Sequence, residues 1–279
     1  MSPLVVLITG CSAGGIGFGL AEEFASKGCI VYASARSVEK MTGLSESVHR
    51  VRMDVNDDKS VAEAVKAVLE EQTRIDILVN NAGTSRVGPL LEIPLDHVEQ
   101  VFQTNVFSIL RVTQAVAPSM VARRSGLVIN VGSVAGILPT PWSGTYSASK
   151  HAVHAITNVL QMELKPFNVK VMLLAPGGVV TKIATVSTEA FSLREDTVYK
   201  DYTEAIISRA MASHSLRGVL TVKEFSRKIV RAALKKSPPF MVSIAPPAGL
   251  FKILTWFPTF VVRAMFSWKL VWKNKSKTA

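Results

Sequence analysis

Short apolar runs alternate along the chain with longer stretches whose apolar residues recur at helical spacing. The apolar runs predict strands at Leu4–Thr9, Cys29–Ser34, Val48–Met53, Ile75–Val79, Leu127–Val131, Val169–Leu174 and Phe240–Ile244. The other stretches predict helices at Ile16–Lys27, Asp58–Gln72, Leu95–Arg124, Tyr146–Lys165 and Lys223–Lys236. This alternation is typical of βαβ units, so we expect an α/β fold with a Rossmann-type doubly wound parallel sheet.

We expect a single domain over residues 1–244, followed by a C-terminal amphipathic extension, residues 245–279, called the tail below. The 279 residues, 48% of them hydrophobic, fit one large α/β domain. Near-continuous apolar strands indicate a sheet covered on both faces, whose ligands bind beyond the carboxyl ends of the strands. The stretch Thr181–Leu220 is the least regular part of the chain.

A glycine-rich loop, Thr9–Gly17, lies between the first predicted strand and the first predicted helix. Glycines allow the backbone to approach a pyrophosphate, and the N-terminus of the following helix offers free N–H groups and partial positive charge. The position between a strand and a helix favours a dinucleotide site over a merely structural turn.

The second strand ends at Ser34 and is followed by Ala35 and Arg36, with no carboxylate to bind a ribose 2′-hydroxyl. Arg36 is placed to meet a 2′-phosphate through charge-assisted hydrogen bonds, unless it is an ordinary surface arginine. We therefore expect NADP(H) as cofactor.

Residues Gly10–Gly14 also fit the GxSxG nucleophile elbow of serine hydrolases, with Ser12 as the nucleophile. A triad would need a histidine and an acid later in the chain, and none of the five histidines has a context that marks it. A lipid ester hydrolase is therefore the second function class. The two cysteines and the other potential ligands suggest no metal site.

Tyr146 and Lys150 are one helical turn apart and share a helix face. An ammonium near a phenol favours the phenolate, so Lys150 is expected to lower the pKa of Tyr146 and let it exchange a proton during hydride transfer. Ser133, just past the strand Leu127–Val131, can donate a hydrogen bond to a substrate oxygen.

Together these features resemble the short-chain dehydrogenase/reductase family over about Leu4 to Ile244. The motifs occur in family order: TG(x)nGxG at Thr9–Gly17, Asp54, NNAG at Asn80–Gly83, Asn105, Ser133, YxxxK at Tyr146–Lys150 and PGG at Pro176–Gly178. No single motif decides the matter, but the ordered set is highly specific. The loop TGCSAGGIG is one residue longer than the common TGxxxGIG and leaves Gly15-Ile16-Gly17 aligned.

The resemblance implies a role for each matching residue. Tyr146 is the acid/base, Lys150 assists it and binds the nicotinamide ribose, Ser133 orients the carbonyl, and Asn105 supports a proton relay. The expected cofactor contacts are Gly10, Gly15, Ile16, Gly17, Ser34, Arg36, Asp54, Asn81, Tyr146, Lys150, Val179 and Thr181. Family members often dimerise through the helices at Leu95–Arg124 and Tyr146–Lys165, so the resemblance makes a homodimer one possible assembly, which the residues alone do not fix.

The long loop and the opening VLITGCSAGGIGFGLAEEFASKG look like the fungal NADPH-dependent 1-acyldihydroxyacetone-phosphate reductases. That resemblance implies a lipid-like ketone substrate, a role in glycerolipid synthesis, and a place on the endoplasmic reticulum or lipid droplet surface facing the cytosol. Retinol- and hydroxysteroid-type dehydrogenases share much of the pattern. Arg194, Lys200, Arg209 and Arg217 are candidates to hold a substrate phosphate, or are ordinary surface charges.

The net charge of +11 arises entirely after Glu224, the last acidic residue. The tail places Trp256, Trp268 and Trp272 among lysines and arginines, and its longest uncharged stretch, Ile253–Val262, is too short to span a bilayer. This composition predicts a segment lying on a membrane or lipid-droplet surface, with the basic ending Lys273–Lys277 on anionic lipid. A lid over the active site or a dimer contact are the alternatives. We expect no nucleic-acid partner.

Overall fold

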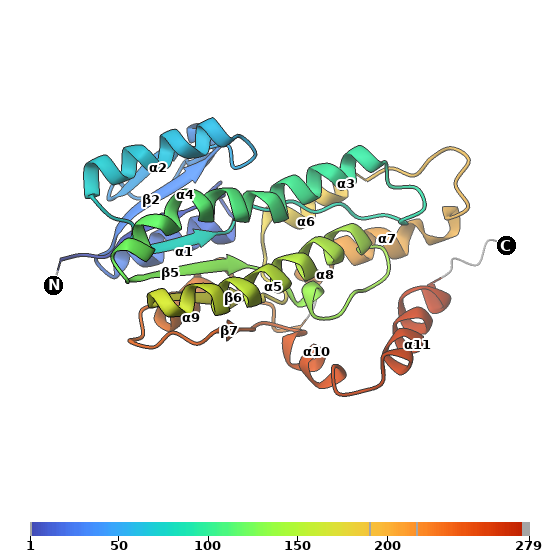
Figure 1. The fold of residues 1–279 in the computed structure, drawn as a ribbon. Coiled ribbons are helices and arrows are strands. Elements are labelled where there is room, and N and C mark those ends of the chain that lie inside the picture. Colours follow the sequence, from blue (N-terminus) through green and yellow to red (C-terminus); the bar gives the residue numbers. More distant parts are fainter. Residues whose placement is uncertain (1, 190, 216, 275–279) are drawn as a thin grey trace.

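The computed structural model describes residues 2–189, 191–215 and 217–274 and confirms the α/β fold (Figure 1). In these residues, seven parallel strands form one sheet in the order β3-β2-β1-β4-β5-β6-β7. The strands are β1 (Val5–Ile8), β2 (Ile30–Ala35), β3 (Val48–Arg52), β4 (Ile77–Asn80), β5 (Gly126–Val131), β6 (Val169–Leu174) and β7 (Met241–Val242). The order reverses between β1 and β4, where an open α/β sheet binds its ligands.

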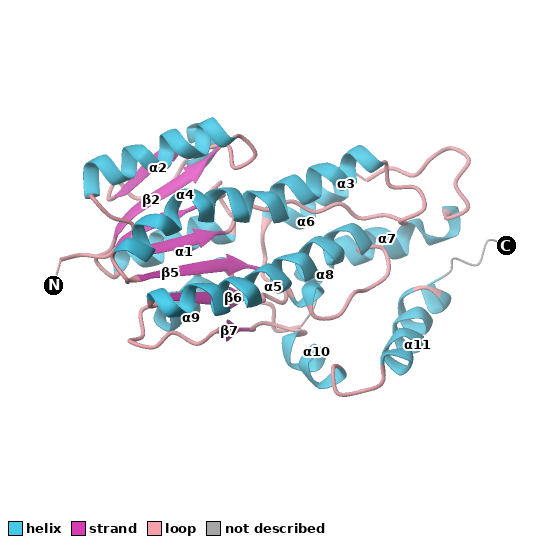
Figure 2. Ribbon diagram, in the orientation of Figure 1, coloured by secondary structure: helices cyan, strands magenta, loops and turns pink. Residues whose placement is uncertain are grey.

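Helices cover both faces of the sheet (Figure 2). Helices α1 (Ile16–Ser26) and α9 (Val222–Ala233) bury Phe24 and Phe225 in a core on one face. On the other face α2 (Asp58–Gln72), α4 (Ser108–Ala122) and α5 (Gly144–Leu164) form a second core. Burial on both faces explains why the central strands, such as β1 and β4, are almost entirely apolar, whereas the edge strand β3 contains exposed polar residues.

The predicted helix Leu95–Arg124 is divided in the structure. Helix α3 (Leu95–Phe102) continues through a π-helical turn, η2 (Gln103–Phe107), into α4. The extra residue of a π-turn locally widens the helix, and such turns are frequent at functional sites. Asn105 lies in this turn and is fully buried.

The irregular stretch after β6 contains α6 (Lys182–Glu189), α7 (Thr203–Ala210) and α8 (Ala212–Ser215). All three lie beyond the carboxyl ends of the strands (Figure 1). Short 3-10 turns occur at η1 (Val38–Met41), η3 (Val134–Gly136), η4 (Lys165–Phe167), η5 (Lys200–Tyr202) and η6 (Trp272–Asn274).

The tail forms α10 (Ala248–Leu254) and α11 (Thr259–Leu270). Both helices bury one side against the body of the protein, where Phe251, Val262 and Phe266 form a small core with Val134 of η3. Within the described residues, none of the helices has the length and apolar character required to cross a bilayer. Lys275–Lys277, part of the predicted basic ending, lie outside the described residues.

Candidate active site

The glycine-rich loop is fitted closely to the loop after β4. Gly10 has a φ of +73°, and a Cβ there would lie 2.7 Å from the Cα of Ala82. The Asn81 side-chain amide donates to the carbonyls of Thr9 and Gly10, at 2.8 and 2.9 Å. A Cβ on Gly17 would lie 2.4 Å from this amide nitrogen. Glycine is therefore required at both positions for the first helix to start so close to the sheet.

The N-terminus of helix α1 has no side-chain cap. Its N-cap residue, Gly15, makes no side-chain capping bond. By contrast, Asp57 caps α2 by accepting from Ser60, and Thr221 and Glu224 form a capping box on α9. The uncapped N–H groups of α1 thus suit an anionic group, as the predicted pyrophosphate requires.

Lys182 was missed by the sequence analysis. Its side chain lies over the phosphate loop, since a Cβ on Gly14 would be 3.3 Å from its Cε. The residue is distant in sequence and opens α6, so only the fold shows that it adds positive charge beside the predicted phosphate site.

Arg36 is exposed and directly follows β2. Ala35 pairs in register with Arg52 at the end of β3, so Arg36 and Arg52 lie at the ends of these neighbouring strands. This arrangement fits a 2′-phosphate. Ser34 is fully buried and its hydroxyl donates to the carbonyl of Ile8 at 3.1 Å, so that group is used within the fold.

The catalytic residues converge at the end of β5. The Lys150 ammonium donates to the carbonyl of Val131 at 2.8 Å and lies 5.7 Å from the centre of the Tyr146 ring. Ser133 lies two residues after this strand and hydrogen-bonds Tyr146. The fold thus brings together the three residues predicted to act on a carbonyl.

Burial dominates the protonation of this group. It raises the pKa of Tyr146, while the hydrogen bond from Ser133 and the charge of Arg209 act in the opposite direction. Burial also lowers the pKa of Lys150 to about 8. The net effect on Tyr146 is opposite to that expected from a nearby ammonium alone, because the buried phenolate loses solvation. Tyr146 is therefore protonated at neutral pH, the state in which a tyrosine can donate a proton.

Asn105 connects the loop after β4 to α5. Its side-chain amide accepts from the N–H of Thr84 at 2.8 Å and donates to the Thr84 carbonyl and the Ser149 hydroxyl, each at 2.9 Å. A Cβ on Gly83 would lie 3.3 Å from Asn105 and 3.7 Å from the Lys150 nitrogen. Asn105 therefore holds the backbone beside Lys150, and the predicted proton relay remains a prediction.

His154 was also missed by the sequence analysis. Its Nε2 accepts a long hydrogen bond, 3.4 Å, from the backbone N–H of Ser133. Burial, with the neighbouring charges of His151 and Lys150, lowers its pKa to about 4. His154 is consequently neutral at physiological pH and supports the backbone at Ser133.

The remaining predicted contacts also follow strand ends. Asp54 comes after β3, and its carboxylate accepts from the N–H of Asn56 at 3.0 Å. Val179 and Thr181 follow β6 and are buried, with Val179 bridged to Leu220. Ile16 opens α1 and is half-buried. The individual cofactor roles of these residues stay predictions.

Ser12, the candidate hydrolase nucleophile, is exposed on the phosphate loop. None of the hydrogen bonds found between described residues joins its hydroxyl to a histidine. Among the described residues, no histidine is therefore hydrogen-bonded to Ser12 as a general base.

Comparisons with known proteins agree with the site geometry. Residues 4–191 match the protein-family model for short chain dehydrogenases. The NADPH-dependent 1-acyldihydroxyacetone phosphate reductase of Schizosaccharomyces pombe is 34% identical over 227 residues, 79% of this chain and 75% of that protein. The 3-ketodihydrosphingosine reductase of Bacteroides thetaiotaomicron is 32% identical over 265 residues, 92% of this chain and 94% of that protein.

Solved structures show the same fold. A short-chain dehydrogenase from Streptomyces avermitilis superposes with a TM-score of 0.79 at 27% identity, covering 95% of both chains. The closed form of serine dehydrogenase complexed with NADP⁺ gives a TM-score of 0.75 at 26% identity, over 87% of this chain and 95% of that one. Because sequence, fold and the arrangement around Tyr146 all agree, the chain belongs to the short-chain dehydrogenase/reductase family and is an oxidoreductase that uses NADP(H).

Proposed function

We propose that the protein uses NADPH to reduce the ketone of 1-acyldihydroxyacetone phosphate to 1-acylglycerol 3-phosphate, a step of glycerolipid synthesis. The observation that carries this proposal is the position of the tail, an apolar and aromatic surface placed next to the catalytic serine. The S. pombe relative is named for this substrate, and the B. thetaiotaomicron relative for another keto lipid. Both relatives are thus named for a lipid substrate that carries a ketone.

The residues of the site suit reduction of a ketone. NADPH, held by the glycine-rich loop and Arg36, would supply the hydride for the carbonyl carbon. Tyr146, protonated at neutral pH, donates its proton to the carbonyl oxygen as negative charge develops there. Ser133 orients the same oxygen through its hydroxyl, and the Lys150 ammonium stabilises the phenolate left on Tyr146.

The tail lies directly beside this chemistry. Val134, the neighbour of Ser133, is buried in the core formed with Phe251, Val262 and Phe266. The opposite side of the tail is open to solvent, and its most exposed side chains are Trp256 (83%), Trp272 (77%), Phe260 (68%) and Trp268 (61%). One side of the tail therefore covers the protein near the site, and the other presents a large apolar surface.

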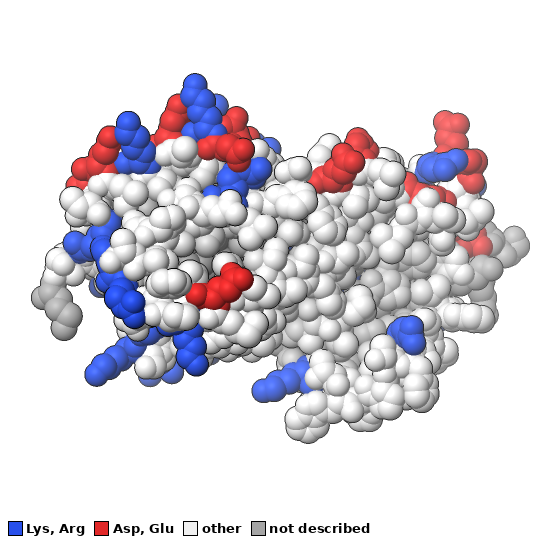
Figure 3. Space-filling view, viewed as in Figure 1, with Lys and Arg blue, Asp and Glu red and all other residues white. Residues whose placement is uncertain are grey.

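We propose that this surface docks on the endoplasmic reticulum or on lipid droplets, facing the cytosol, and that the substrate enters from there. Figure 3 shows the region of α10 and α11 mainly in white, with basic and no acidic side chains. Lys273 lies 5.6 Å from the centre of the Trp268 ring, which places a cation beside an aromatic group of the type found at headgroup level.

The reaction is tested by following NADPH oxidation with a long-chain acyldihydroxyacetone phosphate, and separately with 3-ketodihydrosphingosine, retinal and a keto-steroid. We expect turnover of the acyl phosphate, and its loss in Tyr146→Phe with NADPH binding retained. Preferred turnover of retinal or the keto-steroid would instead support a retinol- or hydroxysteroid-type dehydrogenase. Hydrolysis of a lipid ester without NADPH, abolished by Ser12→Ala alone, would support the hydrolase.

Membrane docking is tested by flotation with vesicles containing anionic phospholipid. Trp256→Ser combined with Phe260→Ser should reduce the bound fraction strongly. Leu91→Ser combined with Leu95→Ser is the matched control, because these leucines are 76% and 79% exposed but lie away from the tail. Equal binding of the two double variants would contradict docking through the tail.

A further inference from the structure

Four basic residues between β6 and α9 are sequence candidates for binding a substrate phosphate, and the structure separates them. Arg194 is exposed and forms an ion pair with Asp196 at 2.6 Å. Lys200 and Arg217 are also exposed. Arg209, on α7, is the partly buried member of the set.

Arg209 is held in a fixed position near the catalytic tyrosine. Its Nε donates to the hydroxyl of Thr140 at 2.8 Å, and Thr140 is buried in the loop between η3 and α5. The charge of Arg209 acts to lower the pKa of Tyr146, against the larger effect of burial, which raises it. The hydrogen bond to Thr140 therefore fixes the guanidinium against the loop that leads into α5 and Tyr146.

No carboxylate neutralises this guanidinium within the part of the chain that the structure describes, because none of the ion pairs found there includes Arg209. The hydrogen bond found between Arg209 and another described residue goes to the neutral hydroxyl of Thr140. Burying a cation without an anion is costly, and burial indeed lowers the pKa of Arg209. Such a cost is recovered when an anionic ligand binds beside it.

We propose that Arg209, positioned by Thr140, is the residue that binds the anionic group of the substrate and so determines headgroup specificity; this inference rests on the ketone reduction proposed above. In acyldihydroxyacetone phosphate, one methylene and one ester oxygen separate the carbonyl carbon from phosphorus. A phosphate so close to the reacting carbon needs a cation close to Tyr146. The planar fork of arginine suits phosphate, and its charge opposes a substrate that carries an amine near the ketone.

The test compares two hexanoyl ketones, chosen short so that they stay monomeric: 1-hexanoyldihydroxyacetone phosphate and neutral 1-hexanoyldihydroxyacetone. In Arg209→Gln, kcat/KM for the phosphate ketone should fall by about 10- to 100-fold, while that for the neutral ketone changes little. Arg194→Gln is the matched control and should alter neither value. Thermal unfolding and NADPH binding confirm that each variant is folded.

An equal loss on both ketones, with a shifted pH profile, would show that Arg209 acts only through the pKa of Tyr146 and would overturn the proposal. A binding measurement separates this failure from failure of the proposed reaction. Calorimetry with the NADP⁺ complex should show that hexanoylglycerol 3-phosphate binds more tightly than hexanoylglycerol, with the difference removed in Arg209→Gln. This preference for the phosphorylated ligand is expected even if another ketone proves to be the substrate. Its absence in the wild-type protein would exclude an anion-binding site at Arg209.

Discussion

The indole N–H of Trp142 donates to the backbone carbonyl of Leu270, with 3.1 Å between nitrogen and oxygen. Leu270 is the last residue of α11, whereas Trp142 lies in the loop that leads into α5 and Tyr146. The Trp142 ring also contacts the rings of Tyr199 and Tyr202. A single side chain therefore connects the tail, the stretch after β6 and the catalytic helix.

Replacing Trp142 with phenylalanine should weaken the packing of the tail on the rest of the protein. The variant keeps an aromatic ring but removes the hydrogen bond to the C-terminal end of α11, at a cost of about 1 kcal/mol. The amide hydrogens of α11 should then exchange about fivefold faster, which is measurable by hydrogen exchange and mass spectrometry. Trp256→Phe, at an exposed position of the tail, is the control. Unchanged exchange in Trp142→Phe would show that the bond does not hold the tail.

Replacing Arg36 with glutamine should change the cofactor preference. Because Arg36 directly follows β2, where a carboxylate would instead select NADH, its loss removes a charge-assisted hydrogen bond that only NADPH can use. We expect KM for NADPH to rise by about tenfold or more, from about 1.5 kcal/mol of lost binding, with KM for NADH nearly unchanged. Arg231→Gln, on the exposed side of α9, should affect neither cofactor. An equal rise for both cofactors would exclude a role in 2′-phosphate recognition.

Much of the fold follows from local patterns in the sequence. Each predicted strand is present, because short apolar runs such as Val5–Ile8, rich in β-branched residues, favour strands. The ends of these strands carry Gly10, Asn81 and Ser133, so their meeting at one edge of the sheet follows from parallel topology. The single-helix prediction over Leu95–Arg124 missed the π-turn, because no residue type distinguishes it from an α-helical turn.

What the sequence could not predict depends on contacts between distant segments. The sequence does not distinguish among the four basic residues that could bind a substrate phosphate. In the structure, α7 places one of them, Arg209, beside Thr140. His154 had no marking context, since its partner is a backbone N–H that follows another strand. The sequence also did not show which side of the tail packs on the protein. Phe266 is buried against Val134, so one side of the tail packs near the site while the other side stays exposed.

Because His154 is neutral in the folded protein, the free energy of unfolding depends on pH in the mildly acidic range. Its folded-state pKa of about 4 is below the ordinary value of 6.5, so between these values the unfolded chain binds a proton that the folded protein excludes. Stability is therefore lost as the pH falls from 6.5 toward 4, by up to about 2–3 kcal/mol. His154→Gln keeps an acceptor for the Ser133 N–H but does not titrate. Urea unfolding at neutral pH and at pH near 5 should show a larger loss for the wild-type protein than for this variant. Parallel losses would place the acid sensitivity elsewhere.

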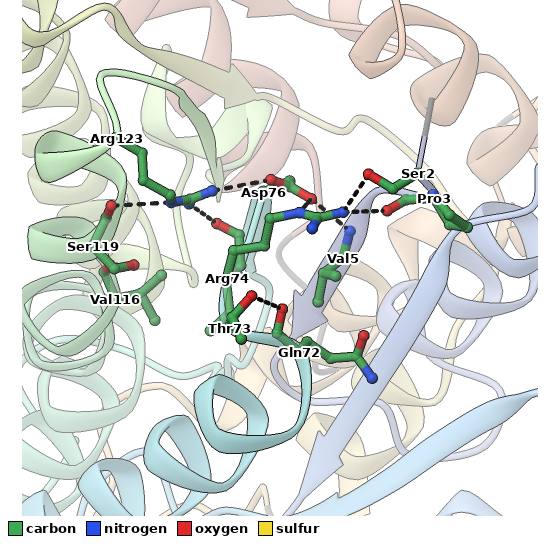
Figure 4. A network of polar contacts seen from close by, with 11 residues as sticks. Ser2, Pro3, Val5, Gln72, Thr73, Arg74, Asp76, Val116, Ser119 and Arg123 are labelled. Carbon is green, nitrogen blue, oxygen red and sulfur yellow. Dashed lines mark hydrogen bonds and ion pairs between the residues drawn. The ribbon is translucent and has the colours of Figure 1, made fainter.

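Asp76 organises the end of the sheet opposite to the active site (Figure 4). Its carboxylate accepts from the N–H of Val5 at 2.9 Å, from Arg74 at 3.0 Å and from Arg123 at 3.2 Å. It thus joins the start of β1 to the end of α4 across β4. Unlike an exposed ion pair, this partly buried carboxylate also satisfies a backbone donor.

Replacing Asp76 with asparagine should therefore lower stability without impairing chemistry. The amide retains one acceptor but directs an NH₂ group toward a donor, so we expect a loss of about 2–3 kcal/mol in the free energy of unfolding. Asp196→Asn, in an exposed pair with Arg194, should leave the free energy of unfolding nearly unchanged, because solvent screens this pair. Because Asp76 lies at the amino ends of the strands and Tyr146 beyond the carboxyl ends, kcat at a temperature where both variants stay folded should equal that of the wild type. A fall in kcat without a loss of stability would instead imply that the two ends of the sheet are coupled.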